Sequence, residues 1–171
     1  MITPYALNRI TREAFISVLG GVFEHSPWVA ARVWERGPFE SAVHLHHEMV
    51  DVVNQAAVWE QLALLTAHPE LGSRLIMSDS SQEEQKSAGL GNLSTELCEE
   101  LVELNDLYKK KFDFPFILAV RGHTSDSIAD ALKRRLANNP ELEFRLALDE
   151  TAKIADFRLR EIIAESSHTV T

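Results

Sequence analysis

Apolar residues recur along the chain at helical spacing. Leu97, Leu101, Leu104 and Tyr108 are separated by four, three and four positions, which places all of them on one face of a helix. Comparable patterns are bounded by capping residues at one end and by glycine or proline at the other. They predict about eight helices, which cover roughly residues 11–19, 27–36, 41–54, 58–67, 81–88, 94–111, 125–136 and 140–162.

One stretch does not follow this pattern. Every residue of Phe114–Val120 is apolar, and the stretch is short for a helix. The sequence offers no second strand as its partner, so its backbone must pair with other loops, with water or with a ligand. We therefore predict an all-α, single-domain bundle over residues 1–171, with one buried extended segment at Phe114–Val120. We expect a flexible tail at about residues 166–171.

Charge excludes several classes of partner. The 171 residues include 17 Lys and Arg but 26 Asp and Glu, for a net charge of −9. This charge argues against nucleic acid and anionic membranes as partners, because both attract basic proteins. No apolar stretch reaches the roughly 20 residues that a membrane-spanning helix needs. A single cysteine allows no intrachain disulfide, and we find no secretory signal or peroxisomal address, so we expect a cytoplasmic protein.

His68 is the first candidate for chemistry. It lies at the expected end of a helix, immediately before Pro69, in the stretch Ala67–Gly72. A histidine there can simply cap the helix, because the helix dipole favours a cation at that end. It can also serve as a general acid or base at a rigid corner, because its ordinary pKa lies close to neutrality.

The second candidate is the helix start at Ser81. Ser81 and Glu84 match a capping box, in which each side chain bonds the other residue's backbone amide. The same helix start presents free amides that can bind a carboxylate or an imide oxygen. A glutamate in this position can also bond an imidazole or a substrate N–H, so both a structural and a functional interpretation stay open.

Two other groups of polar residues stand out. His44, His47 and Glu48 share a helix face while His46 points elsewhere, and the spacing matches no zinc motif, so we expect a solvated or interfacial face rather than a metal site. Arg158 borders the apolar stripe of the last helix, where its guanidinium can bind a carboxylate. No motif for a metal, a phosphate or an organic cofactor is present, and we predict none.

Three separated segments together resemble one known family. Their order and spacing are similar to those of the 2-oxo-4-hydroxy-4-carboxy-5-ureidoimidazoline (OHCU) decarboxylases. The resemblance extends from Asn8–Phe23 to Arg158. The three segments are Ala67–Gly72, Ser81–Leu90 and Tyr108–Gly122.

The resemblance implies an all-helical, cofactor-independent carboxy-lyase that forms (S)-allantoin in the last step from urate. By position, His68 resembles the catalytic acid and Glu84 an essential residue of the site. A small ureidoimidazoline substrate and a homodimer are also implied. The residues that the resemblance places at the substrate are Pro69, Ser81, Gln82, Glu83, Glu84, Gln85, Phe116, Ile117, Leu118, Ala119, Val120 and, near the site, Arg158.

One position departs from the family pattern, and two other functions stay open. Asp113 stands where we expect glycine, which affects a turn but no proposed catalytic group. A non-enzymatic helical module that binds a partner or a small anion would use the amides at Ser81 but would not need His68 in its pocket. A carboxylase-type or hydrolytic enzyme that acts on a related ureido compound is the third option.

Overall fold

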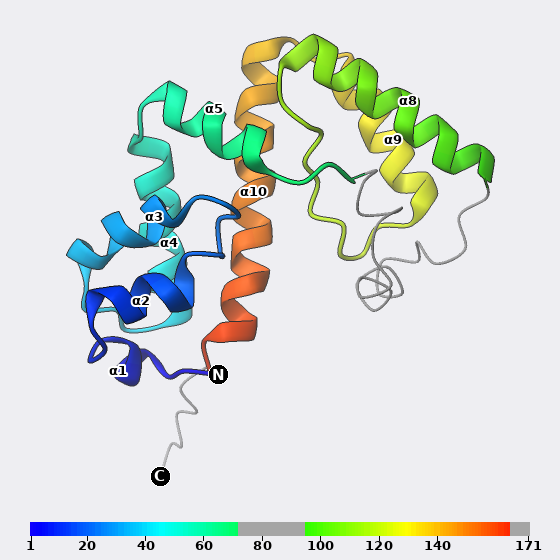
Figure 1. Ribbon diagram of the computed structural model, residues 1–171. Coiled ribbons are helices and arrows are strands. Elements are labelled where there is room, and N and C mark those ends of the chain that lie inside the picture. The colour runs from blue at the N-terminus through cyan, green and yellow to red at the C-terminus, as the bar shows by residue number, and fades with distance from the viewer. Residues whose placement is uncertain (72–94, 165–171) are drawn as a thin grey trace. The chain divides into compact units, whose positions relative to one another are not determined.

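The computed structural model describes residues 1–71 and 95–164 (Figure 1). Within these ranges the chain forms eight α-helices and one short 3-10 helix, and the only strand-like feature is an isolated parallel bridge between Ile2 and Ile163. The all-α prediction is therefore confirmed. The helix expected at 81–88, the first residue of the helix expected at 94–111 and the tail at 166–171 lie outside the described residues.

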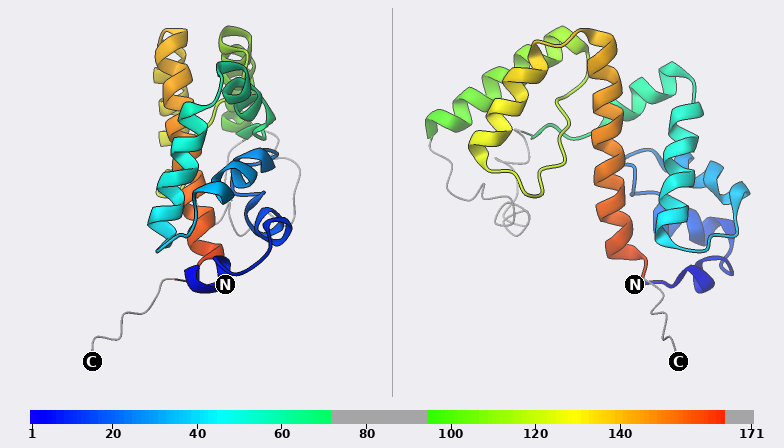
Figure 2. Two further views of the ribbon diagram at one scale, coloured as in Figure 1. Left: turned by 90° about the vertical axis from the view of Figure 1, so that its left-hand side faces the viewer. Right: turned by 180° about the vertical axis from the view of Figure 1, so that it is seen from behind.

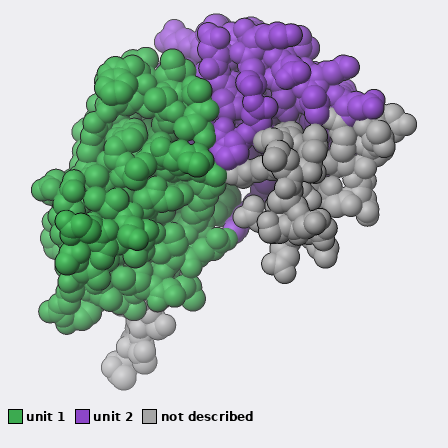
Figure 3. All heavy atoms as spheres, viewed as in Figure 1, with its two compact units in different colours: residues 1–67, 152–171 green, residues 68–151 purple. Residues whose placement is uncertain are grey.

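The described chain divides into two compact units (Figure 3). One comprises residues 1–67 together with those from 152 onward, and the other comprises residues 68–151. The last helix, α10 (Pro140–Ile162), contributes its first part to the second unit and its remainder to the first. That all 171 residues form one domain stays a prediction, and each unit is described by itself.

Side-chain caps start most helices of the first unit. Thr11 accepts a hydrogen bond from the Ala14 amide at 3.3 Å, and Ser41 accepts one from the His44 amide at 3.0 Å. The pair Ser26-Pro27 predicts that Ser26 caps the next helix, but Ser26 makes no such cap and instead donates to the Glu24 carbonyl. The helices of this unit are α1 (Pro4–Leu7), α2 (Arg12–Leu19), α3 (Pro27–Val33), the 3-10 helix η1 (Trp34–Arg36), α4 (Ala42–Gln55) and α5 (Val58–Ala67).

The first unit has an aromatic core. Phe15 is fully buried, stacks on Phe39 at 5.8 Å between ring centroids and meets the edge of Trp34 at 5.1 Å. The N-terminus lies beside the end of α10 (Figure 2), where the Ile2 amide donates to the Ile162 carbonyl at 2.8 Å. The hydrophobic pattern did not predict helix α1, because its four residues are too few to show a helical period.

The second unit is built from α8 (Thr95–Phe112), α9 (Ser125–Leu136) and the first part of α10. Leu101 and Tyr108 of the predicted α8 stripe are fully buried, as are Ile128 and Leu132 of α9. Helix α9 begins with a capping box between Thr124 and Ser127. Between α8 and α9 runs the segment 114–120, which is neither helix nor strand and is mostly buried, as predicted.

The buried face of α10 differs from the one that its apolar spacing predicts. That spacing predicts an inward face of Phe144, Leu148, Ala152, Ala155, Leu159 and Ile162. Ala155 and Leu159 are buried, but the other four are only partly buried. The row at four-residue spacing that is most deeply buried also contains two polar residues, because each finds hydrogen-bond partners. This row consists of Glu143, Ala147, Thr151, Ala155 and Leu159.

Asp113 adopts a left-handed backbone conformation, with φ 63°. Aspartate tolerates this region better than most residues with a Cβ atom, whereas a β-branched residue does not. We expect Asp113→Val to lower the free energy of unfolding by about 1–3 kcal/mol and Asp113→Gly to change it by less than about 1 kcal/mol. Urea denaturation measures both. A Val variant as stable as the Gly variant would contradict this explanation of the turn.

Candidate functional site

His68 lies at a rigid corner of the second unit. Helix α5 ends at Ala67, as predicted, because a residue before proline disfavours helical backbone and Pro69 follows His68. The His68 side chain is buried, with 7% of the residue exposed. The structure therefore encloses this imidazole in the protein rather than leaving it as a solvated helix cap.

The corner is attached to α8 by an ion pair. Lys109 donates to the carboxylate of Glu70, two residues after His68. The bond to this carboxylate also raises the pKa of Lys109. Both side chains are well exposed, so the pair contributes little to stability. It does join the His68 turn to α8, in which the residue before Lys109 is the buried Tyr108.

Segment 116–120 packs on Tyr108. The Tyr108 ring lies 5.3 Å from that of Phe116 and 5.9 Å from that of Phe114, both edge to face. Phe116, Ile117 and Ala119 are buried, whereas Leu118 and Val120 are partly exposed. Helix α8 thus anchors both the His68 turn and this segment, through neighbouring residues.

Charged side chains bind the backbone of this segment. The Ile117 carbonyl accepts a hydrogen bond from Arg135 Nη1 at 2.5 Å, and the Ala119 amide donates to Glu150 Oε2 at 2.8 Å. The Val120 carbonyl accepts from the His123 amide at 3.0 Å. Throughout the described ranges, nothing bonds the N–H or the C=O of Leu118. Protein side chains therefore satisfy part of this buried backbone, and Leu118 keeps a donor and an acceptor for another partner.

A buried carboxylate holds Arg135 in place. Glu143 is fully buried and accepts hydrogen bonds from Arg135 Nε at 2.6 Å, from the Tyr108 hydroxyl at 2.5 Å and from Asn138 Nδ2 at 3.0 Å. Charge-assisted bonds of this kind are stronger than neutral ones. The Arg135 guanidinium also lies over the Phe116 ring, 4.7 Å from its centroid. The network thus fixes both the side chain and the carbonyl at the start of segment 116–120.

Sequence reasoning missed this network. Arg135 stands in a run of three basic residues near a helix end, where favourable interaction with the helix dipole and solvation are sufficient to explain the run. The signal that was available is the position of Glu143, four residues before Ala147 on a row of small and apolar residues. A carboxylate at such an inward position needs a buried cationic partner.

Burial raises the pKa of the Tyr108 hydroxyl, and its bond to Glu143 raises this pKa further. A raised pKa stabilises the folded state fully below the pKa of the unfolded tyrosine, about 10, and this contribution is lost as pH rises above it. In an alkaline titration we therefore expect only Tyr5, which is 68% exposed, to form phenolate in the folded protein. Phenolate absorbance beside circular dichroism measures this, and Tyr5→Phe should abolish the early phase. Ionisation of Tyr108 before unfolding would contradict the network.

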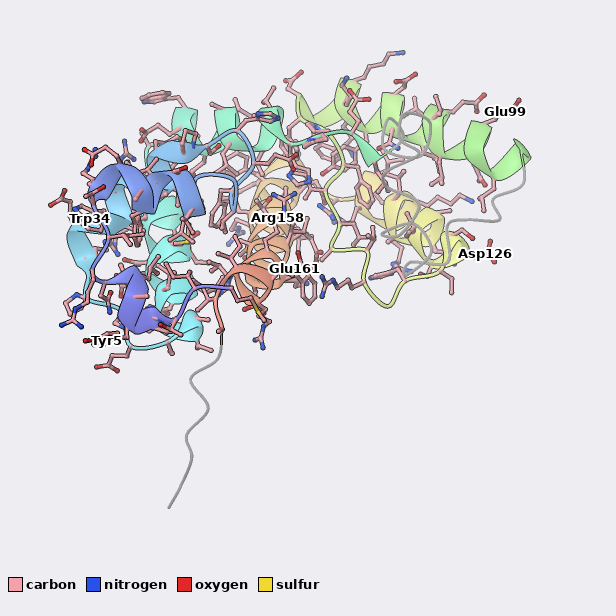
Figure 4. The ribbon with its side chains drawn as sticks, turned by 60° about the horizontal axis from the view of Figure 1, so that its bottom comes forward. Tyr5, Trp34, Glu99, Asp126, Arg158 and Glu161 are labelled. Atoms are coloured by element: carbon pink, nitrogen blue, oxygen red, sulfur yellow. The ribbon has the colours of Figure 1, made fainter. Side chains whose placement is uncertain are left out.

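Arg158 is engaged within the first unit, on the part of α10 that belongs to it (Figure 4). Its Nη2 lies 2.6 Å from Glu24 Oε2, and its Nη1 donates to the carbonyls of Val22 at 3.2 Å and Gly21 at 3.3 Å. The guanidinium is thus held by the loop between α2 and α3. A carboxylate does bind it, as its chemistry favours, but this carboxylate belongs to the protein itself.

The sequence-predicted site residues fall into three groups. His68, Pro69 and segment 116–120 belong to the second unit and are attached to α8. Arg158 belongs to the first unit. The stretch 81–85, which contains Ser81 and Glu84, lies outside the described residues. The roles of all these residues stay predictions.

The three neighbouring histidines of α4 have separate surroundings. His46 Nε2 lies 2.7 Å from the Ala152 carbonyl, and His44 Nδ1 accepts from the Glu40 amide at 3.3 Å. The His47 side chain is 77% exposed. In residues 1–71 and 95–164, no group of three or more His, Cys, Asp or Glu is placed to hold a metal ion. None of the helices described here combines the length and apolar character that crossing a membrane requires.

Comparison with known proteins identifies the family. The model of the OHCU decarboxylase family matches residues 8–160. A 2-oxo-4-hydroxy-4-carboxy-5-ureidoimidazoline decarboxylase of Haloferax volcanii is 42% identical over 94% of this chain and 95% of its own length. The uric acid degradation bifunctional protein of a Bacillus species is 46% identical over 95% of this chain, which spans only 32% of that longer protein.

Solved structures agree with this result. A crystal structure of (S)-allantoin synthase has a TM-score of 0.79 and 32% identity, and the match covers 95% of this chain and 54% of that one. A crystal structure of an OHCU decarboxylase in the presence of (S)-allantoin has a TM-score of 0.69 and 30% identity over 89% of this chain and 97% of that one. Sequence and structure together show that this chain belongs to the OHCU decarboxylase family.

Proposed function

We propose that this chain decarboxylates 2-oxo-4-hydroxy-4-carboxy-5-ureidoimidazoline to (S)-allantoin in the degradation of urate. The observation that carries the proposal is a buried histidine at a proline-fixed corner, in a chain that matches a decarboxylase of nearly its own length. A module that only binds a partner has no need to enclose an imidazole in this way. The related solved structures named for (S)-allantoin support the same product.

The residues fit the chemistry of decarboxylation without an added cofactor. When the bond between C4 of the ring and the carboxylate breaks, CO₂ leaves and its electron pair passes into the unsaturated ring, where the 2-oxo group helps to spread the charge. Backbone N–H groups can stabilise that charge. A proton from the His68 imidazolium then forms the new C–H bond on one face of the ring. Delivery from a single fixed position would account for one enantiomer.

The other predicted residues take supporting roles in this proposal. Glu84 orients His68 or, as an anion beside the substrate carboxylate, favours its departure as neutral CO₂. Pro69 fixes the turn that carries His68, and Arg158 lies near the substrate. The ring and ureido groups are bound by two stretches of chain, Ser81–Gln85 and Phe116–Val120. We also propose that the enzyme acts in the cytoplasm, and that it forms a homodimer, as the family resemblance implies.

Optical rotation during turnover of freshly prepared substrate tests the proposal. The uncatalysed reaction has no stereocontrol and gives racemic allantoin, so it produces no lasting rotation. We expect the purified chain to accelerate the reaction and to build up the rotation of (S)-allantoin. A rate and rotation equal to those of the blank would refute the proposal and favour a binding module. Turnover of related ureido compounds alone would instead favour the hydrolytic or carboxylase-type alternative.

A further inference from the structure

Leu118 lies between two peptide groups that are held by side chains of opposite charge. On its N-terminal side, the Ile117 carbonyl accepts a bond from Arg135, and on its C-terminal side the Ala119 amide donates to Glu150. These side chains come from α9 and α10. The positive group thus holds an acceptor and the negative group holds a donor, so neither contact can exchange with the other.

The geometry of the peptide bond fixes what Leu118 presents. A trans peptide is planar, and its C=O and N–H point in opposite directions. The Leu118 N–H therefore points away from Arg135, and the Leu118 C=O points away from Glu150. Both groups belong to one residue, so Leu118 offers a neighbouring donor and acceptor, each pointing away from the charged side chain that holds its own peptide.

These two groups have no protein partner within the described residues. Leu118 is only partly exposed and is flanked by the buried residues Ile117 and Ala119, and its N–H and C=O make no bond within the described part of the chain. Buried polar groups without partners are costly and rare. A cyclic ureide or a lactam carries a C=O next to an N–H. Its C=O can accept from the Leu118 N–H while its N–H donates to the Leu118 C=O.

We propose that Arg135 and Glu150 are positioning residues, which turn the N–H and C=O of Leu118 toward the cyclic ureide part of the substrate. This inference rests on the proposed function and adds to it two residues that lie outside the predicted site. Arg135 is itself held by Glu143, which also binds Tyr108 and Asn138. The buried network therefore acts on the substrate only through the backbone of segment 116–120.

Steady-state kinetics distinguishes positioning from mere stabilisation. Leu118 is proposed to hold the cyclic ureide, whose bonds stay intact, in the bound substrate as well as in the transition state, so loss of its two bonds weakens both states. We expect Glu150→Ala to raise KM about tenfold and to change kcat less than about threefold. Glu150→Gln should restore KM, because its amide oxygen still accepts from Ala119. The exposed neighbour Asp149 provides the matched control, Asp149→Ala, with KM unchanged.

Arg135→Lys gives a second test. Lysine keeps the charge beside Glu143 but lacks the planar fork that reaches both Glu143 and the Ile117 carbonyl. We expect a folded protein with raised KM, whereas Arg134→Lys, at an exposed position, should behave as wild type. Wild-type KM in both Arg135→Lys and Glu150→Ala, with an active wild type, would overturn this inference alone. An inactive wild type would instead overturn the proposed function.

Amide spectra provide a readout that does not require turnover. In a protein labelled with ¹⁵N-leucine, the Leu118 signal is identified by its loss in Leu118→Met. We expect (S)-allantoin to shift this signal in the wild type and in Glu150→Gln, and to leave it unshifted in Glu150→Ala. If Glu150→Ala does not fold, Glu150→Asp replaces it, because the aspartate side chain is one methylene too short to reach the Ala119 amide. A wild-type Leu118 signal that does not respond to (S)-allantoin would overturn the proposal.

Discussion

Replacing His68 by asparagine is expected to lower kcat by about 10²–10⁴-fold, the range that a general acid contributes. Asparagine keeps a polar group in the buried corner before Pro69, but it cannot deliver a proton at neutral pH. The corner is formed by Pro69 and the end of α5, so we expect the melting temperature to change little. Time-resolved optical rotation gives the rate and the enantiomer in one measurement.

The control for this variant is His47→Asn, because the His47 side chain is 77% exposed on α4. We expect it to retain the activity and the product stereochemistry of the wild type. If His68→Asn were to keep more than half of the wild-type rate, His68 would not be the proton donor. A slow variant that still forms only (S)-allantoin would place the stereocontrol elsewhere.

Truncation of Glu143 to alanine is expected to lower the free energy of unfolding by about 3–5 kcal/mol, as found when one partner of a buried ion pair is removed. The change leaves Arg135, Tyr108 and Asn138 without their common acceptor. The Arg135 side chain is only 11% exposed, so water cannot replace the carboxylate fully. Chemical denaturation of the two proteins measures the difference.

Two further variants isolate the origin of this effect. Glu143→Gln keeps an acceptor for Tyr108 but loses the charge opposite Arg135, so it should lie between Glu143→Ala and the wild type. Glu141→Ala, whose side chain is 88% exposed, should change the free energy of unfolding by less than about 0.5 kcal/mol. A loss below about 1 kcal/mol for Glu143→Ala would show that the network does not hold the second unit together.

Local patterns predicted the helices because the forces that start and end a helix act within one turn. Thr11, Ser41 and Thr124 each cap a helix by accepting from the amide three residues later, and Pro69 disfavours helical backbone at its neighbour. Segment 114–120 could be predicted for the opposite reason, since it lacks any period. Ser26 did not follow its pattern because its hydroxyl bonds the Glu24 carbonyl instead.

The candidate site was predictable only in part. His68 and segment 116–120 were predicted as site residues because several separated motifs together resemble one family. Each motif alone can be explained by a structural role. The partners of the segment, Arg135 and Glu150, come from positions 18 and 31 residues away in the chain. No local pattern indicates such pairs, because the period of a helix shows which face is inward but not which groups meet there.

By itself, the sequence determined an all-helical protein with one unpatterned apolar segment, and its motifs resembled one family of decarboxylases. Capping, periodicity and proline placement depend on residues close together in the chain, so they can be recognised from the sequence alone. Only the tertiary structure decided that Glu143 is fully buried, that it holds Arg135, and that opposite charges bind the peptides on either side of Leu118. The burial of a charge depends on donors brought from distant helices, and only packing brings them together.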